Sequence, residues 1–214
     1  SEKVARCIEA MQKAVQVPVT VKCRIGIDHD DSFEFFLNFI KTVHEAGCNT
    51  FIIHARKAWL KGLSPKENRD IPPLNYERVL ELKKLMPNLN ISINGGIKTL
   101  EHAKELLTQL DGVMIGRAAY ENPWMLKEAD SLIYNTQDPI WKNRKELLTA
   151  YLPYVEQELS QGCPLTIITR HLSSLFNGIP GSRKYRQMLS EQAPKAKDGV
   201  ELLQKAMAFV EEIG

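Results

Sequence analysis

Two short segments decide the fold, Ile91-Ser92-Ile93-Asn94-Gly95-Gly96 and, about 20 residues later, Gly112-Val113-Met114-Ile115-Gly116-Arg117. Each is an apolar run that ends in a glycine turn and leads into a helix-like stretch. Glycine lets the backbone approach a bulky anion, and helix N-termini point free N–H groups at it. Arg117 adds a fixed charge whose fork of donors suits phosphate oxygens. The two turns together predict a phosphate site made of Asn94, Gly95, Gly96, Gly116 and Arg117.

Either turn alone is also typical of an ordinary strand-to-helix connection that needs a positive φ and binds no phosphate. The pair favours the phosphate site, because its spacing is that of one βα unit.

The composition is that of a folded protein. The chain has 214 residues, 43% of them hydrophobic and 25% charged, and a net charge of +2 that by itself indicates no particular partner. No signal peptide and no membrane-spanning run is visible, so we expect a soluble cytoplasmic protein without a membrane partner. The four cysteines, Cys7, Cys23, Cys48 and Cys163, lack metal-ligand spacing and predict reduced thiols and no metal site.

Strand and helix patterns alternate four times over the first part of the chain. Strands are expected at 19–24, 50–54, 91–93 and 112–115, and helices at 2–15, 32–46, 75–86 and 99–107. The first helix should bury a face made of Val4, Ile8, Met11 and Val15, and Asp31 or Ser32 should cap the second. This alternation predicts a parallel sheet with right-handed crossovers.

A phosphate site on the last two strands is typical of an eight-stranded TIM barrel. On that basis these four strands are strands five to eight, and residues 1–137 are predicted to form the C-terminal half of a TIM barrel, without its N-terminal half. The alternative is a small doubly wound sheet that is complete in itself.

From about Asp138 the strand signals stop. Helical patterns at 141–160, 165–176 and 200–213 predict an all-α domain over residues 138–214. Positive charge gathers there around an aromatic residue, Tyr185, which is typical of a nucleic-acid surface, although a solvated charged face is the alternative. The residues concerned are Arg170, His171, Arg183, Lys184 and Arg186.

Lys22 lies inside an apolar strand, near the end where barrel enzymes carry catalytic residues. Strand side chains alternate, so Lys22 and Arg24 should face one way and Cys23 the other. An ammonium buried in a sheet needs an anion or an electron-rich acceptor, which favours a ligand contact over a structural ion pair.

His54 stands at the corresponding end of the next strand and is followed by Arg56 and Lys57. The loop that they open is long enough to suggest a function of its own. It carries donors suited to a polyanion, namely Lys61, Lys66, Asn68 and Arg69.

These residues stand in motifs that closely resemble the tRNA-dihydrouridine synthases, A subfamily, over essentially all 214 residues. The barrel motifs are VKCRIG (21–26), HARKAW (54–59), LSPKENR (63–69), IPPL (71–74), NGGI (94–97) and DGVMIGR (111–117). Residues 170–172 and 175–183 resemble the C-terminal helical domain of that family.

The resemblance implies a flavin enzyme that uses NADPH to reduce the 5,6 double bond of a D-loop uridine in tRNA. It implies that Lys22 and His54 contact the isoalloxazine ring of FMN, while the two glycine turns and Arg117 hold its phosphate. The residues expected to contact the tRNA substrate are Arg56, Lys57, Lys66, Asn68, Arg69, Arg170, Arg183, Lys184 and Arg186.

One feature of the family is missing. Its proton donor is a cysteine in an N-x-G-C-P setting in the first half of the barrel, and none of the four cysteines here has that setting. We therefore expect no catalytic residue in this sequence, and a C-terminal fragment that is inactive by itself.

Two other functions fit parts of the sequence. A phosphate-binding barrel isomerase or aldolase could use Lys22 as a base or Schiff-base lysine. A non-catalytic tRNA-binding module could be built around the C-terminal helices alone.

Overall fold

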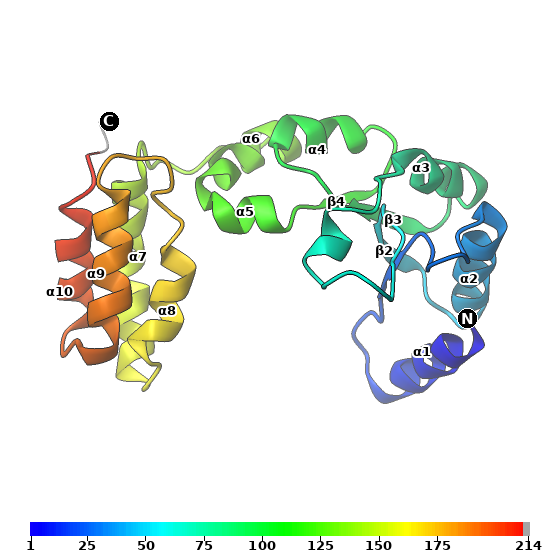
Figure 1. Cartoon of the computed structure of the whole chain (residues 1–214), viewed down its shortest axis with the longest axis horizontal. Coiled ribbons are helices and arrows are strands. Elements are labelled where there is room, and N and C mark those ends of the chain that lie inside the picture. The colour runs from blue at the N-terminus through cyan, green and yellow to red at the C-terminus, as the bar shows by residue number, and fades with distance from the viewer. Residues whose placement is uncertain (212–214) are drawn as a thin grey trace. The chain divides into compact units, whose positions relative to one another are not determined.

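The computed structural model describes residues 1–211 and divides into two compact units, Ser1–Gly116 and Arg117–Gly214 (Figure 1). Each unit has its own hydrophobic core. The boundary lies earlier than the predicted domain boundary at 137/138, and the buried core of the second unit begins only at Leu148.

The first unit is an α/β structure around a four-stranded parallel sheet, as the alternation predicts. The strands are β1 (Val21–Arg24), β2 (Thr50–His54), β3 (Asn90–Asn94) and β4 (Gly112–Met114). They lie in the order β1-β2-β3-β4, each parallel to the next. The doubly wound alternative is therefore wrong, because such a sheet reverses its strand order at a switch point.

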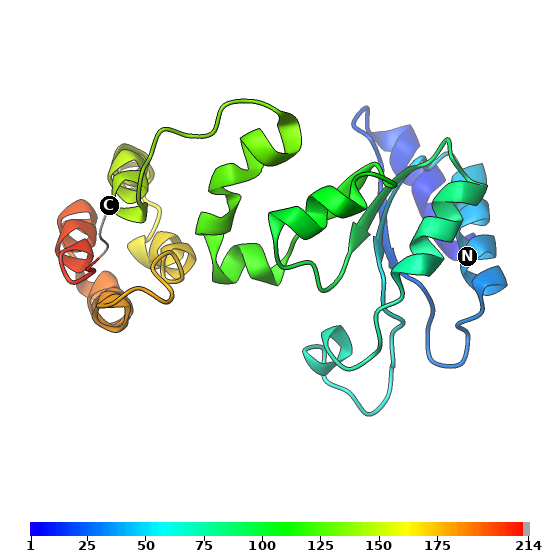
Figure 2. The ribbon, with the colours of Figure 1, turned by 90° about the horizontal axis from the view of Figure 1, so that it is seen from above.

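Four helices build the core against one face of this sheet (Figure 2). They are α1 (Glu2–Ala14), α2 (Phe33–Glu45), α3 (Tyr76–Leu85) and α4 (Leu100–Leu106). The strand side chains that meet them are fully buried and include Phe51, Ile53, Ile91 and Ile93.

The side chains that alternate with this buried set lie on the other face. Lys22 is exposed there, and Ile52 and Ser92 are only half-buried. A parallel sheet in a complete domain is normally covered on both faces. The open face is therefore the part of this unit that is available to ligands or to further protein.

Capping residues define where the helices begin. Ser32, Asn75 and Thr99 each accept a hydrogen bond from the backbone N–H three residues further on, at the starts of α2, α3 and α4. Ser32 rather than Asp31 is the cap of α2, because the Asp31 carboxylate is paired with Lys57.

The predicted buried face of the first helix is wrong at three of its four positions. Ile8 is 4% exposed, but Val4, Met11 and Val15 are 36%, 52% and 42% exposed. Helical periodicity tells which residues share a face, but it does not tell whether another element covers that face. Within the first unit, Ile8 is the residue of α1 that belongs to the buried core, and Ala5 is buried beside it on the helix.

The second unit contains helices and no strand among its described residues. They are α5 (Arg117–Glu121), α6 (Ala129–Tyr134), α7 (Arg144–Ser160), α8 (Leu165–Leu172), α9 (Ser182–Gln192) and α10 (Gly199–Met207), with 3-10 turns η2 (Pro123–Glu128) and η3 (Ala193–Lys195). Helices α7 to α10 lie side by side with similar axes, seen from the side in Figure 1 and end-on in Figure 2. Their core includes Leu148, Phe176, Tyr185 and Leu203, all fully buried.

Several predicted helix ends in this unit differ from the structure. Helix α7 begins at Arg144 rather than at 141, because Asn143 caps it. Helix α8 ends at Leu172 rather than at 176, and α10 ends at Met207; residues 212 and 213 of the predicted helix lie outside the described residues.

Helix α9 was not predicted, and the same holds for α5 and α6. Helix α9 follows Gly181 (φ +83°) and buries Tyr185 and Leu189, which are four residues apart. Two apolar residues at this spacing are a weak helical signal, and the residues around them are mostly polar or cationic.

Hydrogen bonds attach α5 to the α8–α9 region. The Ser174 hydroxyl donates to the Tyr120 carbonyl at 2.5 Å, and the Asn177 amide donates to the Glu121 carbonyl at 2.8 Å. The Tyr120 hydroxyl in turn donates to the Arg170 carbonyl at 3.3 Å. These bonds explain why residues 117–121 group with the second unit.

Asp111 ties the beginnings of β3 and β4 together. Its carboxylate accepts hydrogen bonds from the Ile91 N–H at 2.8 Å and from Lys83 Nζ at 2.7 Å. Asp111→Ala should lower the free energy of unfolding by about 1–2 kcal/mol, because it leaves the Ile91 donor and the Lys83 charge without this acceptor. Urea unfolding followed by circular dichroism measures the change. Glu105→Ala, on the exposed surface of α4, is the control, and an equal effect of both variants would contradict the assignment.

Candidate functional site

The carboxyl ends of the strands bring three of the predicted site residues together. Arg24, His54, Asn94 and Met114 are direct neighbours across the four strands in the parallel register. Lys22 lies one pleat back on the same face as Arg24. Lys22, His54 and Asn94 are therefore neighbours, as expected for the site.

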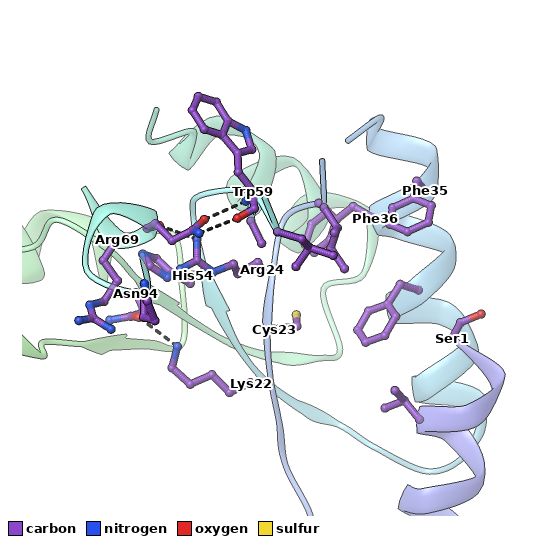
Figure 3. A pocket seen from close by; sticks show the side chains of 18 residues that line it. Ser1, Lys22, Cys23, Arg24, Phe35, Phe36, His54, Trp59, Arg69 and Asn94 are labelled. Carbon is purple, nitrogen blue, oxygen red and sulfur yellow. Dashed lines mark hydrogen bonds between the residues drawn. The ribbon is translucent and has the colours of Figure 1, made fainter. Parts of the chain in front are cut away.

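Asn94 connects Lys22 to the last strand. Its side-chain oxygen accepts a hydrogen bond from Lys22 Nζ at 3.1 Å, and its amide nitrogen donates to the Met114 carbonyl at 2.8 Å. The second bond fixes the amide so that its oxygen faces the lysine (Figure 3). Among the described residues, no carboxylate pairs with Lys22, so the structural ion pair is not formed within this part of the chain.

Lys22 is less buried than the apolar strand around it suggested, since the residue as a whole is exposed on the open face. Partial burial of its amine, followed by the nearby charge of Arg24, still lowers the pKa of Lys22 below the usual lysine value. Cys23 points the other way, against the core, and burial raises the pKa of its thiol to about 12. The predicted alternation of Lys22, Cys23 and Arg24 is thus confirmed.

A pocket of about 920 Å³ opens over these strand ends, entirely within the first unit. Phe35, Phe36 and Phe39 of α2 also line it, but α2 packs against the face of the sheet opposite to Lys22, and Phe36 is fully buried in the core. In Figure 3, Lys22 lies on one side of β1, and Phe35 and Phe36 lie on the other. The polar residues that line the pocket are Ser1, Lys22, Arg24, His54, Asn68, Arg69 and Asn94, and no acidic side chain of the described residues is among the lining.

The pocket carries positive charge without a compensating carboxylate in its lining. Burial first, and then the charges of Arg56 and Arg69, lower the pKa of Arg24. Positive charges that lie close enough to shift each other's pKa repel each other unless an anion neutralises them. The arrangement is therefore suited to an anionic ligand.

The two glycines after Asn94 are needed for the turn itself. Gly95 and Gly96 have φ values of +116° and +69°, and an added Cβ would lie 2.6 Å from His54 Cδ2 or from Leu74 Cδ1 respectively. Larger residues would therefore be strained and would displace side chains at the site. A Cβ on Gly116 would meet no atom within 4 Å, so packing does not require glycine there.

Arg56 has an unused donor. Its Nη1 donates to the Pro72 carbonyl, but its Nε is buried without a hydrogen-bond partner among the described residues. A buried donor without a partner is costly and is usual where a ligand completes the site. This supports the prediction that Arg56 contacts a ligand.

Lys57 and Asn68, also predicted to contact substrate, have partners within the protein. Lys57 Nζ forms an ion pair with Asp31 at 2.7 Å, and its hydrogen bond is the main reason why the pKa of Asp31 is lowered. The Asn68 side chain forms two hydrogen bonds with the backbone of Trp59. Lys66 and Arg69 are exposed, and Arg69 also lines the pocket.

Arg24 and Trp59 are among the residues that line the pocket without having been predicted as site residues. Arg24 could have been found from the alternation that places it on the same face as Lys22. The position of Trp59 depends on contacts within a loop that sequence periodicity does not report.

In the second unit, the predicted cations differ in how they are held. Arg170 Nε donates to His171 at 3.0 Å, Arg186 donates to Asn177 at 2.8 Å, and the Lys184 ammonium lies 5.5 Å from the Phe209 ring centre. Arg183 is exposed and has no hydrogen-bond or ion-pair partner in the described part of the chain.

The described residues contain no group of three or more His, Cys, Asp or Glu side chains that could hold a metal ion. Within residues 1–211, no helix is both long enough and apolar enough to cross a membrane.

The lowered pKa of Lys22 can be measured. Because a lowered pKa leaves more neutral amine at a given pH, acylation of Lys22 should reach half its maximum below the usual lysine value of about 10.4. Labelling across pH with mass-spectrometric readout gives this midpoint. Arg24→Gln should move the midpoint upward, because it removes the second cause of the shift. A midpoint at or above the usual value would contradict the account of the site.

Comparison with known proteins shows what this chain is similar to. The family model described as dihydrouridine synthase (Dus) matches residues 1–212. Proteins named tRNA-dihydrouridine(20/20a) synthase from Yersinia pestis, Pasteurella multocida and Vibrio cholerae are 54%, 53% and 51% identical. The matches cover 98%, 98% and 99% of this chain but 61%, 64% and 65% of the relatives, so the chain spans less than two thirds of their length.

Solved structures give only a distant likeness. A monomeric dihydrodipicolinate synthase variant aligns at 15% identity with a TM-score of 0.43, over 98% of this chain and 80% of the other, which is too low to support an argument. The sequence match is what decides the assignment: the chain belongs to the dihydrouridine synthase family.

Proposed function

We propose that this chain forms part of an FMN-dependent tRNA-dihydrouridine synthase, which uses NADPH to reduce the 5,6 double bond of a D-loop uridine. Membership of the family and the names of the relatives support the reaction and the tRNA substrate. The single observation that carries the proposal is the pocket at the strand ends, where Lys22, Arg24 and Arg69 gather without a carboxylate in the described lining. A tRNA substrate would place the reaction in the cytoplasm.

The sheet is proposed to be one half of a TIM barrel that strands from outside this sequence would close. Three features support this: the consecutive parallel order, the open face, and the β1 and β4 edges that pair with no strand of the described chain. Unpaired edges are a liability in an isolated sheet, and a closed barrel removes them. The exposed Val4, Met11 and Val15 of α1 are consistent with further protein packing there.

The residues present fit FMN. Lys22 and His54 would contact the ring system, and the two glycine turns, with Asn94 and Arg117, would hold the phosphate. The Arg56 Nε, which has no hydrogen-bond partner among the described residues, is a donor that an anionic cofactor or an RNA phosphate would satisfy. When bound, FMN would supply the hydride, and NADPH would restore it.

Lys22 has a defined part in this scheme. The hydrogen bond that its ammonium donates to Asn94 keeps it on the open face, where a positive charge would stabilise negative charge that develops nearby. Its lowered pKa reduces the energy needed to remove its proton.

A proton donor is proposed to come from outside this sequence. Cys23 and Cys48 have raised pKa values because of burial, and Cys163 belongs to the helical unit. Cys7 lies on the exposed side of α1. None has the N-x-G-C-P setting, so the isolated chain should not form dihydrouridine by itself.

The RNA is proposed to contact both units. A uridine must leave its stack to reach a flavin, and Arg56, with Lys57, Lys66 and Arg69 around it, would meet the flipped nucleotide or its phosphates. In the helical unit, Arg170, Arg183, Lys184 and Arg186 would meet the RNA backbone. Arg183 has the most freedom to do so, because it is exposed and has no partner in the described chain.

Titration with FMN tests the pocket directly. The 214-residue chain should bind FMN, and Lys22→Met should weaken binding about tenfold, because a charge-assisted hydrogen bond to the ring is lost. Flavin absorbance or fluorescence quenching measures the affinity. Lys104→Met, on the exposed side of α4, is the matched control. A folded chain that binds tRNA but no FMN would favour the non-catalytic tRNA-binding module.

The contribution of Arg183 can be read from salt dependence. Each phosphate contact adds about one to the slope of log affinity against log salt, so Arg183→Ala should reduce that slope by about 1. The measurement is fluorescence anisotropy with labelled tRNA at several salt concentrations. Lys205→Ala, which removes a cation paired with Glu201 on α10, is the control. An unchanged slope for Arg183→Ala would exclude Arg183 from the RNA contact.

A further inference from the structure

The loop between β2 and α3 is held against the loop that follows β1. The Ala58 N–H donates to the Gly26 carbonyl at 2.9 Å, and the Asp28 N–H donates to the Ala58 carbonyl at 2.7 Å. Ile27 and Ala58 form a parallel bridge, so the pairing of β1 with β2 resumes beyond the strand ends. A loop that is irregular in sequence is therefore fixed where it leaves the sheet.

Arg24 closes this loop upon itself. A single guanidinium nitrogen, Nη1, donates to the Lys57 carbonyl at 2.9 Å and to the Asn68 carbonyl at 2.8 Å. The two carbonyls lie 11 residues apart in the chain. The half-buried Arg24 side chain therefore joins the beginning of the loop to its end.

The side chain of Asn68, which belongs to the loop itself, also joins the end of the loop to its beginning. Its Oδ1 accepts from the Trp59 N–H at 2.8 Å, and its Nδ2 donates to the Trp59 carbonyl at 2.6 Å. The side-chain amide thus pairs with the Trp59 backbone in both directions, as a neighbouring strand would. These two bonds engage both ends of the Asn68 amide.

Two acidic residues hold the loop from outside. Asp31 pairs with Lys57 at 2.7 Å, and the Asp28 carboxylate accepts from the Leu60 N–H at 2.8 Å. Ser64 and Glu67 also bond to each other's backbone N–H, which sets the short turn that presents Asn68. The loop is therefore attached at several places, and the contact of Arg24 with Asn68 is one of them.

We propose that Asn68 is a positioning residue, which acts with Arg24 as a clasp, and that it does not itself contact RNA. The clasp holds Trp59 and Arg69, which both line the pocket, in place at its opening (Figure 3). That the positioned residues serve RNA binding rests on the proposed function. The clasp itself depends only on the hydrogen bonds.

Limited trypsin digestion of the full 214-residue chain tests the clasp. Lys61 and Lys66 are exposed and lie inside the clasped segment, so cleavage after them reports opening of the loop. Asn68→Ala should speed cleavage at both sites about tenfold or more, because two hydrogen bonds are lost. Asn68→Asp keeps the acceptor for the Trp59 N–H and should restore part of the protection. Asn88→Ala, an exposed asparagine whose side chain makes no hydrogen bond in the described chain, is the control.

Binding of a tRNA D-arm hairpin, measured on the same variants, separates a positioning role of Asn68 from a direct contact of Asn68 with RNA. Positioning predicts that Asn68→Ala both speeds cleavage and weakens RNA binding, and that Asn68→Asp partly restores both. Weaker binding with unchanged cleavage would make Asn68 a direct contact and overturn the proposal. Faster cleavage with unchanged RNA binding would overturn the positioning role, and unchanged cleavage in Asn68→Ala would overturn the clasp. If the unmodified chain binds no RNA, the proposed function fails, while the cleavage rates still decide whether the clasp exists.

Discussion

The register of the parallel sheet is the constraint on which the site depends. Parallel strands carry their carboxyl ends to one edge, and here that register aligns Arg24, His54 and Asn94 as neighbours. Asn94 is then held by the Met114 carbonyl of β4, and it holds Lys22 of β1. Backbone pairing and two side-chain hydrogen bonds thereby join strand residues that lie as far apart in the sequence as Lys22 and Met114 into one surface.

Charge gives this surface its chemical character. Lys22, Arg24 and Arg69 line the pocket, and Arg56 lies close enough to lower the pKa of Arg24. Asp28 and Asp31 of the neighbouring loop are engaged by that loop itself. No acidic side chain of the described residues joins these cations in the lining, so the pocket is positively charged.

The long loop after β2 illustrates how a functional segment can lack regular structure and still be ordered. Its backbone polar groups are satisfied by side chains of Arg24, Asn68 and Asp28 instead of by a helix or sheet ladder. In the helical unit, the Ser174 and Asn177 side chains do the same for the Tyr120 and Glu121 carbonyls of the segment that follows β4. Both segments would be hard to assign from sequence, because these bonds join residues far apart in the chain.

The sequence by itself determined the four strands and their helices, because periodicity and capping are local: Ser32, Asn75 and Thr99 stand where the helices begin. It also determined the family, through motifs that the comparison independently matched. Only the tertiary structure decided that Val4, Met11 and Val15 remain exposed within the described chain, since burial depends on what covers a face. Only the structure showed that Asn68 pairs with Trp59 and that Lys57 pairs with Asp31, because the identity of a polar residue does not reveal whether its partner is a ligand or its own chain.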